Sequence, residues 1–441
     1  MYKKEYTLKS ILFFPTRFFP AISGAEFYIQ RIAKLFQKQY NYKVKILTSN
    51  AIDFKALREK TGKKIENEHK YFHSVDNLDI KRYSVNYDVD LKNSIKYLNS
   101  CSLFRSLDLS RECLSEYLKN GPYLTDFFKD WSGKNKNDIN GSYDLIHTTF
   151  YPYFNLIFSL YIGKLLDIPT VCTPFYHYSN PRYSNSQLEE TLHKFDLLIA
   201  CTEREKRYLT NKIKIDEKKV KVIPMGVDFN RYQRVHKKTY KNYSFKDKFF
   251  QEGTHDYKLI LFCGYKNYEK GAVSILKAIP YILEKFPRVY FVFIGPSTKS
   301  FDMQKANLSK STRKYIINFT PANMNGYFDK KKMTAFAESD IYVMPSRSDA
   351  FGIAYLEAWA SATPVIGARS GATPEVIHHN KNGLLVEFDN PEDIANKILK
   401  LLGDGALRER LGKSGQKRVK KRFTWEKVAE KTNKVYNQLM E

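Results

Sequence analysis

Short apolar runs alternate with helix-like segments twice along this chain, and this alternation is what most restricts its fold. In the first half the apolar runs lie at 10–16, 42–48, 144–148, 169–173, 196–202 and 220–224. In the second half they lie at 258–263, 289–294, 315–319 and 341–345, with helix-like segments near 272–285, 302–313 and 329–338. Apolar strands separated by helices are typical of parallel sheets that helices cover on both faces. The sequence therefore predicts an α/β protein with two Rossmann-like doubly wound domains facing a cleft.

The length of the chain supports two domains, because 441 residues exceed what one hydrophobic core ordinarily holds. We predict one domain over 1–235, a second over 236–424 and a separate final helix over 425–441. Residues 51–140 are rich in Lys, Asn, Tyr and Asp and lack a clear period. We interpret them as an elaborated excursion of the first domain, partly helical and partly extended.

The chain is strongly basic, with 73 Lys and Arg against 47 Asp and Glu and a net charge of +26. Such a charge favours phosphate-bearing substrates, an anionic membrane surface or nucleic acid. Lysines are spread along the whole chain, so runs such as Lys330-Lys331-Lys332 are typical of solvated surface. We find no nucleic-acid reader motif and predict no specific nucleic-acid partner. An anionic membrane surface is the partner that we favour for the excess charge.

Cysteine usage and the N-terminus indicate the compartment. The five cysteines are scattered without the spacing of a metal or redox site, which is typical of buried thiols in a reducing cytosol. The apolar run near the N-terminus is interrupted by Arg17 and by two prolines, so we interpret it as a first strand rather than a signal peptide. The apolar stretch Phe154–Gly163 is too short to cross a bilayer. We expect a cytoplasmic protein, peripheral at the inner face of the membrane.

The segment from Asp340 to Ile377 carries the strongest chemical signal. An apolar strand leads through a polar loop into a helix that opens at Phe351-Gly352, with Asp349 before the helix and Glu357 inside it. A helix N-terminus presents unpaired N–H groups and a positive dipole end, which suit a phosphate. A strand–turn–helix with glycine also occurs in any doubly wound domain, and Glu357 alone could be a solvated helix acid.

The order of these residues resembles the donor signature of retaining GT-B glycosyltransferases, of group 1 or family 4. By this resemblance, Glu357 would bind the ribose of a nucleotide sugar and Asp349 would hold a hydroxyl of the transferred sugar. The backbone N–H groups of Phe351, Gly352 and Ile353 would face the phosphates and the sugar. The family more often has glutamate where Asp349 stands.

The segment 259–279 resembles the diphosphate-binding loop of the same family. A strand ends at Gly264, and the following loop presents Lys266 and Lys270 before a helix that begins at Gly271. Lys270 matches the family lysine that neutralises the diphosphate leaving group. Tyr265 stands where the family usually has arginine, and we expect Lys266 to substitute for it. The alternative is an ordinary basic loop between a strand and a helix.

In the first half, Gly24 and Glu26 resemble the family's glycine-rich loop, where the backbone approaches the donor or the acceptor. His147 and His177 follow strand-like runs, at the end of a sheet where ligand contacts gather. The resemblance implies a histidine near the reacting sugar, and His147 is our candidate, with Glu26 and His177 on the acceptor side. Thr149 replaces the second histidine of the family's pattern. Packing explains a lone histidine equally well.

The resemblance implies a retaining hexosyltransferase that moves a sugar from a nucleotide-sugar donor to a glycan or lipid-linked acceptor, without a metal ion or cofactor. It also implies that the final helix crosses back to the first domain. A metal-binding interpretation of Asp88-Val89-Asp90 is disfavoured, because the motif lies in the poorly patterned excursion. Three alternatives remain open: a nucleotide-sugar-binding protein without transferase activity, a phosphorylase on the same fold, and an epimerase on the same fold.

Overall fold

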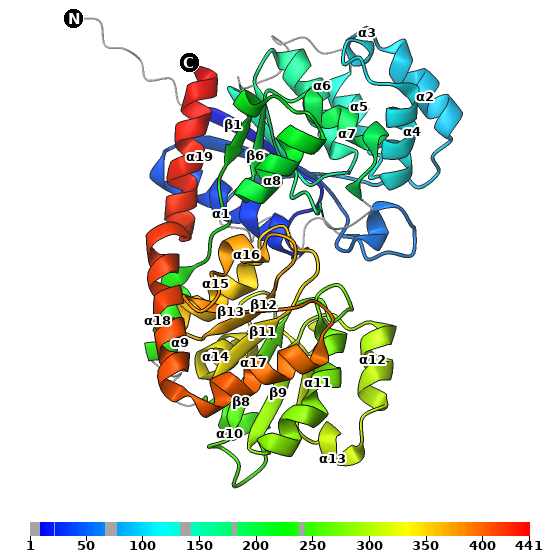
Figure 1. Ribbon diagram of the computed structural model, residues 1–441. Helices are drawn as coiled ribbons and strands as arrows, with labels where there is room; N and C mark the ends of the chain where they lie inside the picture. The colour runs from blue at the N-terminus through cyan, green and yellow to red at the C-terminus, as the bar shows by residue number, and fades with distance from the viewer. Residues whose placement is uncertain (1–8, 22, 67–76, 133–142, 179–182, 238–242) are drawn as a thin grey trace, which may run out of the picture. The chain divides into compact units, whose positions relative to one another are not determined.

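The structure is a computed structural model that describes residues 9–21, 23–66, 77–132, 143–178, 183–237 and 243–441. The chain forms two compact units. The first comprises Met1–Tyr176, Asn180–Ile223 and Val428–Glu441, and the second comprises His177–Ser179 and Pro224–Lys427. Each unit is built around its own parallel sheet (Figure 1), which confirms the predicted pair of doubly wound α/β domains.

The sheet of the first unit has seven strands in the order β3-β2-β1-β4-β5-β6-β7. Every pair of neighbours is parallel. The strand order reverses between β1 and β4, and ligands of open α/β sheets bind at the carboxyl ends of strands beside such a switch point. The strands are β1 (Ser10–Pro15), β2 (Lys43–Ser49), β3 (Asp79–Tyr83), β4 (Leu145–Thr149), β5 (Thr170–Thr173), β6 (Leu197–Ala200) and β7 (Val220–Val222).

The sheet of the second unit has six parallel strands in the order β10-β9-β8-β11-β12-β13. Its switch point lies between β8 and β11. The central strands are apolar along their whole length, because helices cover both faces of the sheet. The strands are β8 (Lys258–Cys263), β9 (Val289–Ile294), β10 (Ile316–Phe319), β11 (Ile341–Met344), β12 (Val365–Ala368) and β13 (Gly383–Val386).

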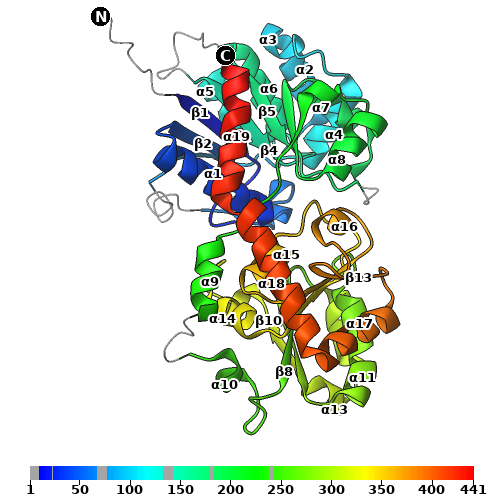
Figure 2. The same ribbon diagram turned by 60° about the vertical axis from the view of Figure 1, so that its left-hand side comes forward.

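The helices of the first unit pack by apolar stripes, as the predicted first helix shows. This helix buries Ile29, Ile32 and Phe36, which share one face at helical spacing. The final helix lies beside it (Figure 2), with the Phe36 and Tyr436 rings 5.2 Å apart. The helices are α1 (Gly24–Gln39), α2 (Leu91–Ser100), α3 (Ser102–Arg105), α4 (Arg111–Asn120), α5 (Thr125–Trp131), α6 (Asn155–Leu166), α7 (Ser186–His193), α8 (Glu203–Arg207) and, from Val428 onward, α19 (Trp425–Met440).

The helices of the second unit cover its sheet, with α11 and α17 packed side by side in Figure 1. The predicted helix at 302–313 is two shorter helices, because Ser309 interrupts it and caps the second. The helices are α9 (Phe229–Lys237), α10 (Phe245–Phe249), α11 (Ala272–Lys285), α12 (Lys299–Ala306), α13 (Lys310–Arg313), α14 (Lys330–Glu338), α15 (Ile353–Ala360), α16 (Thr373–Val376), α17 (Pro391–Gly403) and α18 (Gly405–Arg422).

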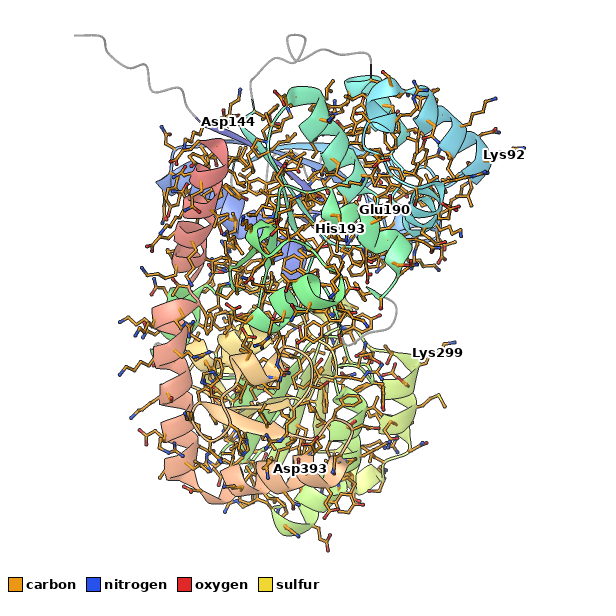
Figure 3. All side chains as sticks on the ribbon, turned by 45° about the horizontal axis from the view of Figure 1, so that its top comes forward. Lys92, Asp144, Glu190, His193, Lys299 and Asp393 are labelled. Carbon is orange, nitrogen blue, oxygen red and sulfur yellow. The ribbon has the colours of Figure 1, made fainter. Side chains whose placement is uncertain are left out.

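The excursion at 51–140 contains β3 and the helices α2 to α5, while residues 67–76 and 133–140 lie outside the described part. Its core is aromatic: the Phe127 ring stacks on Phe158 of α6 at 4.1 Å, and Trp131 donates to the Tyr83 hydroxyl at 2.9 Å. Glu190 of α7, labelled in Figure 3, accepts a hydrogen bond from the backbone N–H of Ser110 at 2.7 Å. The contacts of Phe127 and Ser110 anchor the excursion to α6 and α7 of the first unit.

No helix in the described part of the chain is both long enough and apolar enough to cross a membrane.

Candidate active site

Two loops meet at the carboxyl end of the second sheet, because the strands that precede them, β8 and β11, are neighbours. One loop, residues 264–271, joins β8 to α11, and the other, residues 345–352, joins β11 to α15. The backbone N–H of Arg347 donates to the Glu269 carbonyl oxygen at 2.8 Å, and the Arg347 side chain pairs with the Glu269 carboxylate. These contacts hold against each other the two loops that the sequence predicts to bind the donor.

Lys270 and Asp349 form an ion pair between these loops. The Lys270 Nζ lies 2.7 Å from Asp349 Oδ2 and donates to the carbonyl oxygen of Ser348 at 3.3 Å. Their side chains are 22% and 14% exposed, so the pair is partly buried but still within reach of a ligand. The structure therefore brings together two of the residues that the sequence predicts to be catalytic.

The surroundings of Asp349 favour its ionised form. Burial alone would raise the pKa of this carboxyl group. The Lys270 ammonium and its hydrogen bond outweigh burial, with smaller contributions from His177 and from the backbone N–H of Phe351, so the pKa lies below its ordinary value. The carboxylate is therefore charged near neutral pH, where it orients the Lys270 ammonium.

His177 lies beside this pair and groups with the second unit. Its Nδ1 is 3.3 Å from the Ser348 hydroxyl oxygen. Burial, reinforced by the charge of Lys270, lowers the pKa of His177 to about 4, so the imidazole is neutral at pH 7. The sequence predicts His177 on the acceptor side, and the structure places it next to the residues predicted to act on the donor.

Glu357 lies inside a buried polar network of the second unit. Its Oε1 is 2.8 Å from the Lys332 Nζ and also accepts from the Tyr232 hydroxyl, and the Tyr327 hydroxyl bonds to the same carboxylate. The Lys332 and Glu357 side chains are only 8% and 2% exposed. The carboxylate predicted to bind ribose is therefore already held by α14, by α9 and by the loop before α14.

The sequence patterns did not identify Lys332 or Tyr232 as residues of the site. Lys332 belongs to the run Lys330–Lys332, which we interpreted as surface. The signal that could have found it is helical spacing, because Ala335 and Phe336, three and four residues later, are buried on the same face of α14. Tyr232 lies on α9, in a segment after β7 for which the sequence predicts no helix or strand.

Lys266 does not project toward Lys270. It is fully buried and donates to the Asn318 side chain and, at 2.9 Å, to the Phe319 carbonyl oxygen, both on β10. Burial lowers the pKa of Lys266 to about 8. Gly264, at the end of β8, donates its backbone N–H to Ile294 of β9 at 2.9 Å. In this structure the Lys266 side chain joins the loop after β8 to the end of β10 rather than supplying the expected second cation.

The start of α15 explains why Gly352 is needed. Gly352 precedes the helix with φ +93, and a Cβ at this position would lie 2.5 Å from the Tyr355 ring. Only glycine tolerates this left-handed backbone without strain. The Phe351 ring packs on Phe423 at 5.6 Å, and the Phe351 backbone N–H donates a hydrogen bond to the Asp349 carboxylate. Ile353 is the first helical residue.

In the first unit, Gly24 begins α1 and Glu26 is committed to neighbouring side chains. The Glu26 Oε1 is 2.8 Å from Arg17 Nη2, and the Ser23 hydroxyl donates to the same carboxylate. Arg17 and Glu26 are both buried. The predicted acceptor-side acid is thus one half of an internal ion pair.

His147 is buried in the first unit between β5 and α19. Its Nδ1 bonds to the Tyr436 hydroxyl, and its Nε2 is 2.8 Å from the Thr173 hydroxyl oxygen. Burial lowers the pKa of His147 to about 3, so the imidazole is neutral at physiological pH. These contacts correspond to the packing role, one of the two roles that the sequence allows for His147.

The two buried imidazoles should make the protein less stable on acidification. Their folded pKa values, about 3 and about 4, lie below the ordinary value of 6.5, so below pH 6.5 the unfolded chain binds protons that the folded chain excludes. The free energy of unfolding should then fall by up to about 1.4 kcal/mol per pH unit for each histidine, down to its folded pKa. Urea unfolding of wild type and His147→Gln at pH 7, 6 and 5 measures this slope.

In this experiment His147→Gln should lose stability less steeply with acid than wild type, whatever its stability at pH 7. The control is His193→Gln, because His193 is an exposed residue of α7, labelled in Figure 3. Parallel slopes for wild type and His147→Gln would contradict the prediction.

The disfavoured metal motif has ordinary structural partners. Asp90 caps α2 by accepting from the backbone N–H of Asn93 at 3.1 Å, and Asp88 lies 2.9 Å from the Lys60 Nζ. Among the described residues, no group of three or more His, Cys, Asp or Glu side chains is arranged to hold a metal ion.

Comparison with known families agrees with the geometry of both units. The model of "Glycosyl transferases group 1" matches residues 244–418, which include both loops of the site. The model of "Glycosyltransferase Family 4" matches residues 114–231 of the first half. Together the two matches cover about two thirds of the chain.

Individual relatives are similar over about half of this chain. The spore coat protein SA of Bacillus subtilis is 31% identical over 240 residues, which cover 52% of this chain and 61% of that protein. A D-inositol 3-phosphate glycosyltransferase of Corynebacterium jeikeium is 26% identical over 250 residues, which cover 55% of this chain and 58% of that enzyme. The similarity therefore spans about three fifths of each of these relatives.

Similarity in three dimensions covers the whole fold. The HepE protein of Anabaena, solved in complex with UDP and glucose, aligns over 97% of this chain and 99% of its own, with a TM-score of 0.67 and 15% identity. At this identity the likeness concerns the fold alone. The chain therefore belongs to the glycosyltransferases, by its group 1 match over 244–418 and its family 4 match over 114–231, and it has their two-domain GT-B fold.

Proposed function

We propose that this protein is a retaining, metal-independent glycosyltransferase that moves a sugar from a nucleotide-sugar donor to a glycan or lipid-linked acceptor. The observation that carries the proposal is the Lys270–Asp349 pair at the entrance to α15. An oriented ammonium group beside a helix N-terminus suits a diphosphate, both in the bound donor and as it departs. UDP is the first candidate nucleotide, because HepE was solved with UDP and with UDP-glucose.

The proposed chemistry assigns a role to each of the three charged residues Lys270, Asp349 and Glu357. Lys270 would stabilise the negative charge that develops on the diphosphate, an electrostatic contribution realised mainly in the transition state. Asp349 would orient Lys270 and hold a hydroxyl of the sugar. Glu357 would accept hydrogen bonds from the ribose, beside those that its Oε1 already accepts from Lys332 and from the Tyr232 hydroxyl.

A same-face displacement is the route that we propose for transfer. The bond between the anomeric carbon and the diphosphate oxygen breaks, and the acceptor hydroxyl oxygen bonds to that carbon from the same face. The acceptor's proton passes to the departing phosphate oxygen. No side chain among the residues of the candidate site stands out as a covalent nucleophile, which favours this route over a double displacement. Inversion of the anomeric configuration in the product would contradict it.

Donor turnover without an acceptor should reveal the activity first. Purified protein is incubated with a panel of UDP-, GDP- and ADP-sugars in EDTA, and release of the nucleoside diphosphate is followed for wild type, Lys270→Ala and Glu357→Ala. We expect slow release from one donor, undiminished by EDTA and lost in both variants. Loss of release on chelation, restored by Mg²⁺ or Mn²⁺, would contradict metal independence.

The same assay separates the proposal from its alternatives. Tight nucleotide binding without release, and without product from any acceptor, would favour a nucleotide-sugar-binding protein. Sugar phosphate formed from a glycan and inorganic phosphate would favour a phosphorylase, and a donor converted to its epimer would favour an epimerase. Absence of nucleotide binding would refute the site.

We also propose that the basic surface brings the protein to an anionic membrane surface, where lipid-linked acceptors lie. Co-sedimentation with anionic vesicles but not with zwitterionic vesicles, at physiological salt, is the expected result.

A further inference from the structure

A second cluster of side chains lies in the first unit, at loops that follow neighbouring strands. Phe54 follows β2, Phe150 and Tyr153 follow β4, and Phe175 follows β5. The centre of the Phe54 ring lies 6.0 Å from that of the Phe150 ring and 6.1 Å from that of the Tyr153 ring. The centres of the Phe150 and Phe175 rings are 6.1 Å apart. We call these four residues the aromatic cluster. It occupies the carboxyl ends of strands beside the switch point, where open α/β sheets bind ligands.

The cluster combines buried aromatic residues with one exposed aromatic ring. Tyr153 and Phe175 are buried, Phe150 is half-buried, and Phe54 is 38% exposed. A single exposed apolar side chain on a surface needs no explanation. Phe54 differs, because its ring continues a packed aromatic layer at the ligand-binding edge of the sheet and is held in place by that layer.

The charged groups next to the cluster are already paired. The Arg17 guanidinium lies 3.6 Å from the centre of the Phe54 ring and forms its ion pair with Glu26. Lys55 lies 3.7 Å from the Glu59 carboxylate. The Asp53 carboxylate accepts from the backbone N–H groups of Ala56 at 2.8 Å and Lys63 at 3.1 Å. Among the described residues next to the cluster, these three charged side chains already have partners, so this part of the edge offers an aromatic surface.

These features select among the ligands that an acceptor could present. Small-molecule sites are typically apolar and aromatic with a few fixed polar groups, as here. The face of an aromatic ring is electron-rich and attracts the C–H groups of a sugar ring, while the sugar hydroxyls meet polar groups at the rim. A phosphate would require an unpaired cation or a row of N–H groups, and the Asp53 carboxylate would repel it.

We propose that the aromatic cluster binds an uncharged sugar ring of the acceptor, packed against Phe54. This inference rests on the proposed transferase function and adds the class of the acceptor: the unit bound here is a neutral sugar rather than a sugar phosphate, an inositol phosphate or a lipid chain. Arg17 and Glu26 fix the position of Phe54 and the loops around it.

The test compares wild type with Phe54→Ala, Phe54→Tyr and the control Tyr97→Ala, because Tyr97 is another exposed aromatic residue of the same unit. Binding of methyl glycosides of glucose, galactose, mannose and N-acetylglucosamine is measured by saturation-transfer NMR, beside the sugar 6-phosphates and inositol 3-phosphate. The same compounds are then added to the donor-release assay.

We expect at least one neutral glycoside to bind wild type and to accelerate nucleotide release. Phe54→Ala should raise its KM about tenfold or more, with donor hydrolysis in the absence of acceptor unchanged. Phe54→Tyr and Tyr97→Ala should behave as wild type. If wild type releases no nucleotide, the proposed transferase function fails, whereas the NMR measurement still decides the sugar site.

Three results would overturn the inference. The first is preferential binding of a sugar phosphate or inositol phosphate, and the second is glycoside binding that Phe54→Ala leaves unchanged. The third is the absence of binding by every neutral glycoside tested.

Discussion

Lys270→Ala should lower turnover of the sugar donor by about 100-fold to 1,000-fold, the usual effect of removing one group that stabilises developing charge. The effect should fall mainly on kcat, because the ammonium interacts most strongly with the diphosphate as it departs. Nucleoside diphosphate release under saturating donor gives kcat directly, and a full donor titration separates kcat from KM.

The control for this experiment is Lys277→Ala, which removes an exposed lysine from α11, the helix that Lys270 precedes. It changes the net charge by the same amount and should leave both constants unchanged. A Lys270→Ala enzyme with wild-type kcat would remove Lys270 from the leaving-group role. Equal losses in both variants would point to a general charge effect.

Lys332→Met should destabilise the second unit by about 3–5 kcal/mol, because it leaves the Glu357 carboxylate buried without its cation. The two side chains are 8% and 2% exposed, so water cannot replace the lost partner. Donor turnover should fall as well, since the carboxylate that we assign to the ribose loses its fixed position. Urea unfolding followed by a probe in the second unit measures the first effect, and the donor-release assay measures the second.

A double variant separates these two consequences. Lys332→Met with Glu357→Gln removes both charges and should recover much of the lost stability, while donor turnover stays low. Lys330→Met, an exposed position of the same helix, is the control and should match wild type in both measurements. Unchanged stability in Lys332→Met would mean that the ion pair does not form in solution.

The fold could be predicted from the sequence because its signals are local. Strands such as β9 are continuous apolar runs, and α1, α11 and α19 show helical spacing within one segment, so their positions follow from period alone. The short strands β3 and β13 were not predicted. In β3 (Asp79–Tyr83) buried and exposed residues alternate at first, within a region that lacks a wider pattern.

The candidate site likewise contains some residues that local sequence patterns identify and others that they do not. Asp349 and Lys270 could be found because each follows a strand in a distinctive loop, and neighbouring parallel strands bring such loops together. The direction of a side chain depends on distant partners instead. Lys266 turns toward β10 because Asn318 and Phe319 accept its hydrogen bonds, more than fifty residues away along the chain. Lys332, Tyr232 and Glu357 likewise meet only in the folded unit.

The bond between His147 and Tyr436 has a consequence for the order in which the two units can finish folding. The first unit takes its last segment from Val428–Glu441, whereas the second unit ends at Lys427. As the chain leaves the ribosome, the second unit is therefore complete before the first. The N-terminal unit, which would ordinarily finish folding first, must wait with part of its core uncovered until the final helix emerges.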